Sequence, residues 1–270
     1  MENFPPRESY HYINNETKNY CEEIINYSSK DTLDLYHRLV LLRLISNAKG
    51  KLENRKLPMV TKSAYSEYFK KIVDDIDSYK NATGFYLFPN DAFKKDLGIC
   101  RLNLIPAGHA LLEIRNLPKR FLLKGGIKQF IQGVLFIVFE LGGFHPLLER
   151  HLDSRPDSIS LQKFNPEGRK GFYLITAEIL RMNPEIKGTF NTCWYFDPKI
   201  KEISPKLTYI RELDKQFGGK YFFMGTNEQC INDATFKSPT RRKLFQEGKY
   251  LPTNYLLIVP RGKLIKAAGG

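Results

Sequence analysis

Acidic, basic and imidazole side chains gather between His145 and Arg155. His151 can act as a base near neutral pH, and Asp153 can fix the tautomer of its imidazole. Arg155 can bind a phosphate or a carboxylate through two parallel hydrogen bonds. We therefore predict that His151 and Asp153 are catalytic and that Arg155 binds an anionic cofactor. The alternative interpretation is a charged, solvated helix end.

A second polar group begins at Ser238 and continues through Pro239 to Arg241 and Arg242. The free N–H groups of a helix start and two guanidinium groups together suit an anion. Helix capping by Ser238, with Pro239 in the first helical position, explains the same residues without a ligand. We predict Ser238, Arg241 and Arg242 as cofactor-binding residues and Tyr250 as a catalytic proton donor.

No residues have the spacing of a metal site. His109 and Glu113 are four residues apart on a predicted strand, where about 13 Å separates such positions. The cysteines form no CxxC or Cys/His pattern; they are Cys21, Cys100, Cys193 and Cys230. We predict no metal and reduced thiols, which favours a cytoplasmic protein.

The chain is strongly basic, with a formal net charge of +13. From residue 198 onward it contains 14 lysines and arginines against six acidic residues. Such an excess favours an anionic partner, which could be nucleic acid, a small-molecule ligand with phosphate groups or an acidic surface. A solvated basic face explains the same excess without a partner. Because no zinc-finger, helix-turn-helix or RNA-binding motif is present, the sequence indicates no specific nucleic-acid fold.

The elements that position these residues are predicted to be helices in the N-terminal part of the chain and both strands and helices in the rest. Residues 1–80 form a helical region with helices over 16–48 and 63–79, and a polar linker separates them. Residues 84–270 form an α/β body, a layered mixed sheet with flanking helices. The apolar segment 126–141 is predicted as a buried helix, because it is too short and too often interrupted to span a membrane.

The rest of the body supplies the predicted strands. We expect strands over 98–104 and 109–114, a short helix over 146–152 and a helix over 170–182. Strands and helices then alternate, with strands at 188–196, 220–224 and 254–259 and helices at 205–217 and 227–247.

This C-terminal alternation resembles the second half of the GNAT acyltransferase superfamily. The segment Arg242–Tyr250, followed by Tyr255–Ile258, is similar to the last helix, the glycine-aromatic corner and the final strand of that fold. Asn227 stands where such enzymes often have a polar residue. The resemblance implies acyl transfer from acyl-CoA, with the cofactor pyrophosphate held by a glycine-rich loop after the central strand. The segment Asp197–Pro205, which follows strand 188–196, contains no glycine.

Four short segments also look like those of a group of uncharacterised bacterial proteins. They are His151–Arg155, Tyr195–Pro198, Ile203–Pro205 and Ser238–Arg242. This second resemblance implies a bacterial origin and no particular activity.

Three functions fit these observations. The first is an acyltransferase that moves an acyl group from a thioester, on CoA or on an acyl carrier, to an amine. The second is a nucleotide- or phosphate-dependent transferase that uses a histidine–carboxylate pair as base. The third is a basic, non-enzymatic module that binds nucleic acid or an acidic protein. We further predict that the His151 and Ser238 groups converge on one anion-binding pocket, because a bound anion would relieve the repulsion among their cations.

Overall fold

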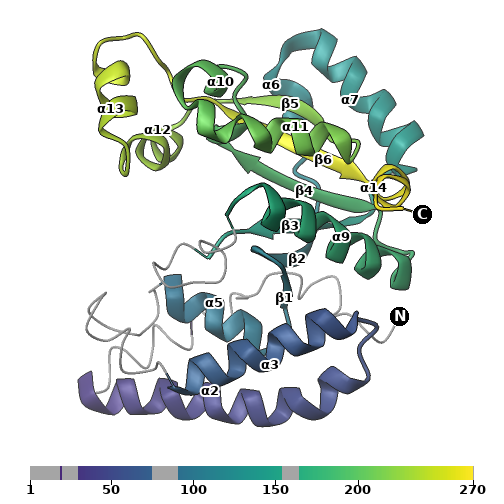
Figure 1. The fold of residues 1–270 in the computed structure, drawn as a ribbon, viewed down its shortest axis with the longest axis vertical. Coiled ribbons are helices and arrows are strands. Elements are labelled where there is room, and N and C mark those ends of the chain that lie inside the picture. Colours follow the sequence, from purple (N-terminus) through teal and green to yellow (C-terminus); the bar gives the residue numbers. More distant parts are fainter. Residues whose placement is uncertain (1–18, 20–29, 75–90, 154–163, 270) are drawn as a thin grey trace. The chain divides into compact units, whose positions relative to one another are not determined.

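The computed structural model describes residues 19, 30–74, 91–153 and 164–269. It is a mixed α/β protein with strands flanked by helices and a helical N-terminal region, as the sequence predicts (Figure 1). The chain divides into two compact units, residues 1–115 with 151–164 and residues 116–150 with 165–270. These units do not coincide with the division into 1–80 and 84–270, and residues 79–84 lie outside the described part of the chain.

The first unit contains three described helices and a β-hairpin. The helices are α2 (Lys30–Glu53), α3 (Met59–Asp74) and α5 (Asp91–Cys100), and the hairpin joins β1 (Leu104–Ala107) to β2 (Ala110–Asn116). Helix α2 continues through the residues predicted as the start of a linker. The strand predicted over 98–104 is wrong, because α5 and a turn occupy most of it. Packing explains this difference: every residue from Phe93 to Cys100 except Lys94 is buried, so the segment lacks a half-exposed strand pattern.

The sheet of the second unit has the strand order β3-β4-β6-β5. Its strands are β3 (Pro146–His151), β4 (Gly188–Cys193), β5 (Lys220–Gly225) and β6 (Asn254–Pro260). Strands β3 and β4 are parallel, whereas β6 is antiparallel to both β4 and β5. Helix α9 (Pro166–Met182) connects the two parallel strands. The parallel crossover is therefore β3–α9–β4, and its helix precedes β4, whereas the segment Asp197–Pro205 follows β4.

Strand β3 corrects the short helix predicted over 146–152. Leucine, glutamate and arginine in this segment are good helix formers, which favours a helix locally. Pairing of Leu148 with Thr189 and of Glu149 with Phe190 makes it a strand instead. Strand propensity depends on such partners, and here the partner is about 40 residues away.

The C-terminal alternation of strands and helices is confirmed. Strand β4 ends at Cys193 and is followed by a 3-10 turn, η2 (Trp194–Phe196). Helix α11 (Thr208–Gln216) precedes β5, and the predicted helix with an interruption is the pair α12 (Glu228–Thr235) and α13 (Pro239–Gln246). The smaller helices of this unit are α6 (Phe121–Lys124), α10 (Ile200–Ile203) and α14 (Arg261–Ala267).

Helix α7 (Gly126–Leu141) forms where the sequence predicts it, but the prediction that it is buried is wrong. Only Gly133, Phe136, Ile137 and Leu141 are buried, whereas Ile127 and Phe139 are 80% and 78% exposed. The buried side joins a core of apolar residues from the sheet, α6 and the segment before α6, namely Leu117, Phe121, Leu147, Phe190, Phe222, Met224, Leu256 and Ile258. No helix among the described residues has both the length and the apolarity needed to cross a membrane.

Candidate functional site

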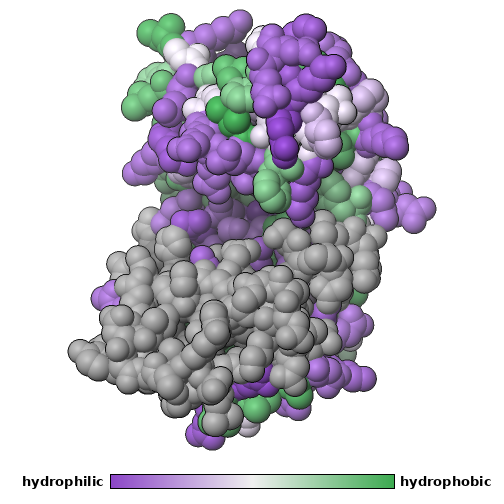
Figure 2. All heavy atoms as spheres, turned by 90° about the vertical axis from the view of Figure 1, so that its left-hand side faces the viewer, coloured by the Kyte–Doolittle hydropathy of each residue, from purple (hydrophilic) through white to green (hydrophobic). Residues whose placement is uncertain are grey.

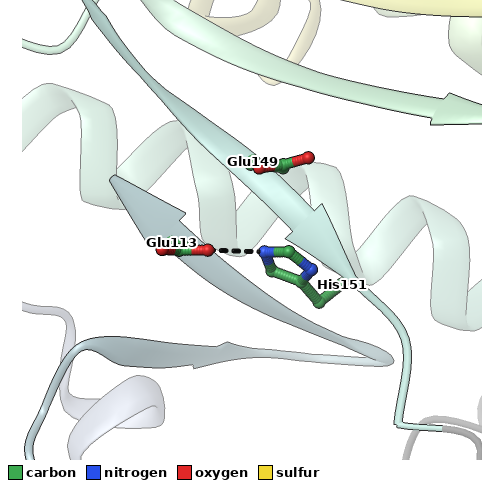
Figure 3. Close-up of side chains that lie close together, drawn as sticks. All are labelled: Glu113, Glu149 and His151. Carbon is green, nitrogen blue, oxygen red and sulfur yellow. Dashed lines mark hydrogen bonds and ion pairs between the residues drawn. The ribbon is translucent and has the colours of Figure 1, made fainter. Parts of the chain in front are cut away.

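The described contacts of His151 lead to a carboxylate on a different strand. His151 is the last residue of β3, and its Nε2 lies 2.9 Å from Oε2 of Glu113 on β2 (Figure 3). The Glu113 side chain is fully buried, and that of His151 is 24% exposed. A buried carboxylate fixes the orientation of the imidazole, and the His151 side chain is partly exposed.

Glu113 therefore makes the contact that the sequence assigned to Asp153. Asp153 itself is buried, and Arg155 lies outside the described residues. The sequence reasoning missed Glu113 because it considered only the distance to His109 on the same strand. Glu149 is two residues before His151, so the two side chains project to the same side of β3 (Figure 3). Histidine and glutamate both bind zinc, so Glu113, Glu149 and His151 could hold a metal ion. The sequence predicts no metal.

Arg150 occupies the space next to the carboxyl ends of β3 and β4. It is 3% exposed, its Nη2 lies 3.3 Å from the Tyr195 hydroxyl, and its guanidinium carbon is 5.5 Å from the ring centres of Phe172 and Phe196. Its Nε has no hydrogen-bond partner among the described residues. The narrow gap beside it lies between α9 and the strands and leaves no room for a water molecule. A ligand would enter here only if the gap widens.

A buried carboxylate, Asp214 of α11, organises a second polar cluster. Arg169 of α9 donates from Nε to Asp214 Oδ1 at 2.7 Å and makes a further short contact through Nη2. The hydroxyls of Tyr173 and Tyr221 donate to the same carboxylate at 2.6 and 2.5 Å. Burial and the negative charge of Asp214 raise the pKa of both tyrosines. Burial lowers the pKa of Arg169, but Asp214 more than offsets this and raises it overall.

The residues around Ser238 that are predicted to bind an anion contact other groups of the protein. Ser238 caps α13 by accepting a 3.3 Å hydrogen bond from the Arg241 N–H. Arg241 donates to the Ala234 carbonyl at 2.5 Å and to Ser204 at 3.0 Å, and it lies 4.5 Å above the Trp194 ring. Arg242 donates to the Phe236 carbonyl at 2.8 Å.

These contacts match the capping interpretation, because both arginines satisfy carbonyl groups at the end of α12. Figure 2 shows that the surface around α12 and α13 is mainly hydrophilic. Anion binding by Ser238, Arg241 and Arg242 stays a prediction, as does their convergence with His151, Asp153 and Arg155 on one pocket.

Tyr250, the predicted proton donor, is 2% exposed. Its hydroxyl has no hydrogen-bond partner in the part of the chain that the structure describes. Burial raises its pKa; the negative charge of Asp197 adds to the rise, and Arg241 opposes it. The hydroxyl is therefore protonated at neutral pH, as a proton donor must be.

The thiols near the end of β4 are poor nucleophiles. Burial raises the pKa of Cys193 to about 11 and that of Cys230 to about 12. Because the thiolate is the reactive form, both are protonated near pH 7. A covalent acyl-cysteine intermediate is thus disfavoured at these two positions.

Comparison with known proteins shows which fold this chain resembles. No model of a known protein family and no curated protein matches the sequence. A solved acyltransferase in complex with decanoyl-CoA superposes with a TM-score of 0.51 at 13% identity, covering 83% of this chain and 65% of the other. The fold is acyltransferase-like. An acyltransferase complex with CoA and 10C-teicoplanin gives a TM-score of 0.47 at 12% identity, with 82% and 65% coverage. The chain thus spans about two thirds of the length of these proteins, and at such identity the likeness concerns the fold alone.

Proposed function

We propose that this protein is an acyltransferase of the GNAT type that moves an acyl group from acyl-CoA to an amine. The observation that carries the proposal is the parallel β3–α9–β4 crossover beside the antiparallel pairs β4–β6 and β5–β6. Its strands pair at Leu148–Thr189 and Glu149–Phe190, in the middle of β3 and the first half of β4. Open α/β sheets bind their ligands at the carboxyl ends of such strands. The fold likeness to an acyltransferase in complex with decanoyl-CoA supports the same function.

The predicted catalytic side chains suit direct transfer. In the proposed reaction His151, oriented by Glu113, takes a proton from the acceptor amine. The amine nitrogen attacks the thioester carbonyl carbon, and the carbon–sulfur bond breaks. The departing thiolate takes a proton from Tyr250, whose hydroxyl is protonated at neutral pH. The protonated Cys193 and Cys230 favour this one-step route over a cysteine-bound intermediate.

The first turns of α9 are the proposed binding site for the CoA diphosphate. Asn165 caps the helix by accepting a 2.8 Å hydrogen bond from the Gly168 N–H. A phosphate oxygen would replace this side-chain acceptor, as anions do at helix N-termini. A Cβ atom at Gly171 would meet no other atom within 4 Å, so a side chain there projects into open space. The glycines Gly168 and Gly171 thus stand in the crossover helix, whereas Asp197–Pro205 has none.

A charge at Gly171 tests this placement. Thermal-shift titrations with decanoyl-CoA, acetyl-CoA, ATP and a short oligonucleotide would compare the parent with Gly171→Glu and Gly262→Glu. Gly262 is the matched control, because it also lies in a helix and a Cβ there meets no atom within 4 Å. We expect CoA thioesters to stabilise the parent by about 2.7 kcal/mol at 100 times the dissociation constant. Gly171→Glu should weaken that binding about tenfold or more, because it places a negative charge beside the phosphates.

The outcomes separate the three functions. Stabilisation by ATP alone would favour the phosphate-dependent transferase, and stabilisation by the oligonucleotide alone would favour the basic binding module. Equal CoA affinity in the two glutamate variants would overturn the placement on α9. No response to any CoA thioester would overturn the acyltransferase proposal itself.

A further inference from the structure

Helix α7 presents a continuous apolar surface that the rest of the described chain leaves uncovered. Ile127, Ile131, Val134, Leu135, Val138 and Phe139 are each between 37% and 80% exposed. The steps from 127 to 131, 134 and 138 follow the helical repeat, so these side chains form one stripe along the helix. The opposite side of the helix packs against the protein, and the ring centres of Phe136 and Phe222 are 5.4 Å apart. Contiguous exposed apolar surface of this kind marks an interaction site.

The charges next to this stripe all have the same sign. Lys119, Arg120, Lys124 and Lys128 are exposed, and no acidic residue occurs from Leu117 to Phe139. The next acidic residue, Glu140, is paired with Lys263 at 2.7 Å. Lys124 and Lys128 thus stand at the N-terminal end of the stripe, and Lys119 lies 5.0 Å from the Phe144 ring, just beyond its C-terminal end. This pattern is complementary to a surface with an apolar interior and anionic head groups.

We propose that α7 docks this protein onto the surface of an anionic lipid bilayer. The helix would lie in the plane of the membrane, with its apolar stripe among the upper acyl chains and its lysines at the phosphate groups. Sixteen residues are too few for a span, and the other side of the helix is packed in the protein core. A second copy of this chain is a poorer occupant, because each copy carries a formal net charge of +13 and the two would repel each other. The proposal is independent of the acyltransferase function.

Vesicle flotation of the full chain tests the docking. Vesicles of phosphatidylcholine alone would be compared with vesicles containing about 30% phosphatidylglycerol, at low and high salt. We expect binding to the anionic vesicles that weakens with salt. Ile131→Glu should lower the partition coefficient about tenfold or more, because a carboxylate replaces a side chain that enters the acyl region. Lys124→Glu together with Lys128→Glu should weaken binding to anionic vesicles and reduce its salt dependence.

Leu251→Glu is the matched control, because Leu251 and Ile131 are both 53% exposed and Leu251 lies far along the chain from α7. We expect it to bind vesicles like the parent. Circular dichroism and light scattering of each variant would establish that fold and oligomeric state are unchanged. Equal loss of binding in Leu251→Glu and Ile131→Glu would overturn the proposal, and so would failure of the parent to float with anionic vesicles. A stable parent dimer that Ile131→Glu separates, without vesicle binding, would assign the stripe to a second copy instead.

Discussion

Tyr173 and Tyr250 are both almost completely buried, yet their hydroxyl groups have opposite surroundings. The Tyr173 hydroxyl donates to Asp214 at 2.6 Å, in a cluster where Arg169 and Tyr221 bind the same carboxylate. The Tyr250 hydroxyl has no partner among the described residues. A buried donor without a partner costs free energy, whereas a donor bound to a charged acceptor contributes to stability. The comparison indicates that the Asp214 cluster stabilises the fold, and the unpartnered Tyr250 hydroxyl supports its proposed role as a proton donor.

The largest expected effect comes from removing the charge that holds the cluster together. Asp214→Asn should lower the free energy of unfolding by about 3–5 kcal/mol, because it leaves the Arg169 charge buried without a counter-ion. Urea unfolding followed by circular dichroism measures this difference. Glu212→Gln on the same helix is the control; Glu212 is exposed, so we expect a change within about 0.5 kcal/mol. Similar values for both variants would show that Asp214 does not organise the core.

The tyrosines of the cluster add a pH dependence with a definite sign. Burial and Asp214 raise the pKa of Tyr173 and Tyr221 above the ordinary value of 10.0. Below pH 10 these hydroxyls are neutral in both the folded and the unfolded chain, so they cause no change in stability. Above pH 10 they ionise first in the unfolded chain. The free energy of unfolding should then fall by about 1.4 kcal/mol per pH unit for each tyrosine.

Urea titrations between pH 8 and pH 11 measure this slope. Tyr221→Phe should reduce the slope above pH 10 by the contribution of one tyrosine. A free energy of unfolding that stays constant up to pH 11 would contradict the role of the cluster.

The sequence predicted some elements and contacts of this molecule and missed others, for physical reasons. The alternation of α11, β5, α12, α13 and β6 depends on local signals and was predicted correctly, and the cap at Ser238 matches the alternative interpretation of that segment. The contacts between Arg169 and Asp214 and between His151 and Glu113 join residues 45 and 38 positions apart. Only the packing of distant strands and helices brings such residues together. The spacing of residues along the chain therefore does not predict these contacts.

Helix α7 was mispredicted for a related reason. Its residues are apolar almost all round, which is typical of a buried helix. The pattern of such a helix does not indicate which side the protein covers. Here the rest of the described chain covers only the side of Phe136 and Ile137.

The smallest expected effect on stability is the most direct test of the comparison between Tyr173 and Tyr250. Replacing tyrosine with phenylalanine should lower the free energy of unfolding at position 173 but not at position 250. Tyr250→Phe removes an unpaired buried hydroxyl and should leave the free energy of unfolding unchanged or raise it by about 1 kcal/mol. Tyr173→Phe removes a donor from Asp214 and should lower it by about 1.5–3 kcal/mol. If Tyr250 donates the proton to the leaving thiolate, Tyr250→Phe should also lower the rate of acyl transfer about 100-fold or more, measured as release of free CoA thiol. Loss of stability in Tyr250→Phe would instead mean that its hydroxyl serves the fold, and the contrast with Tyr173 would disappear.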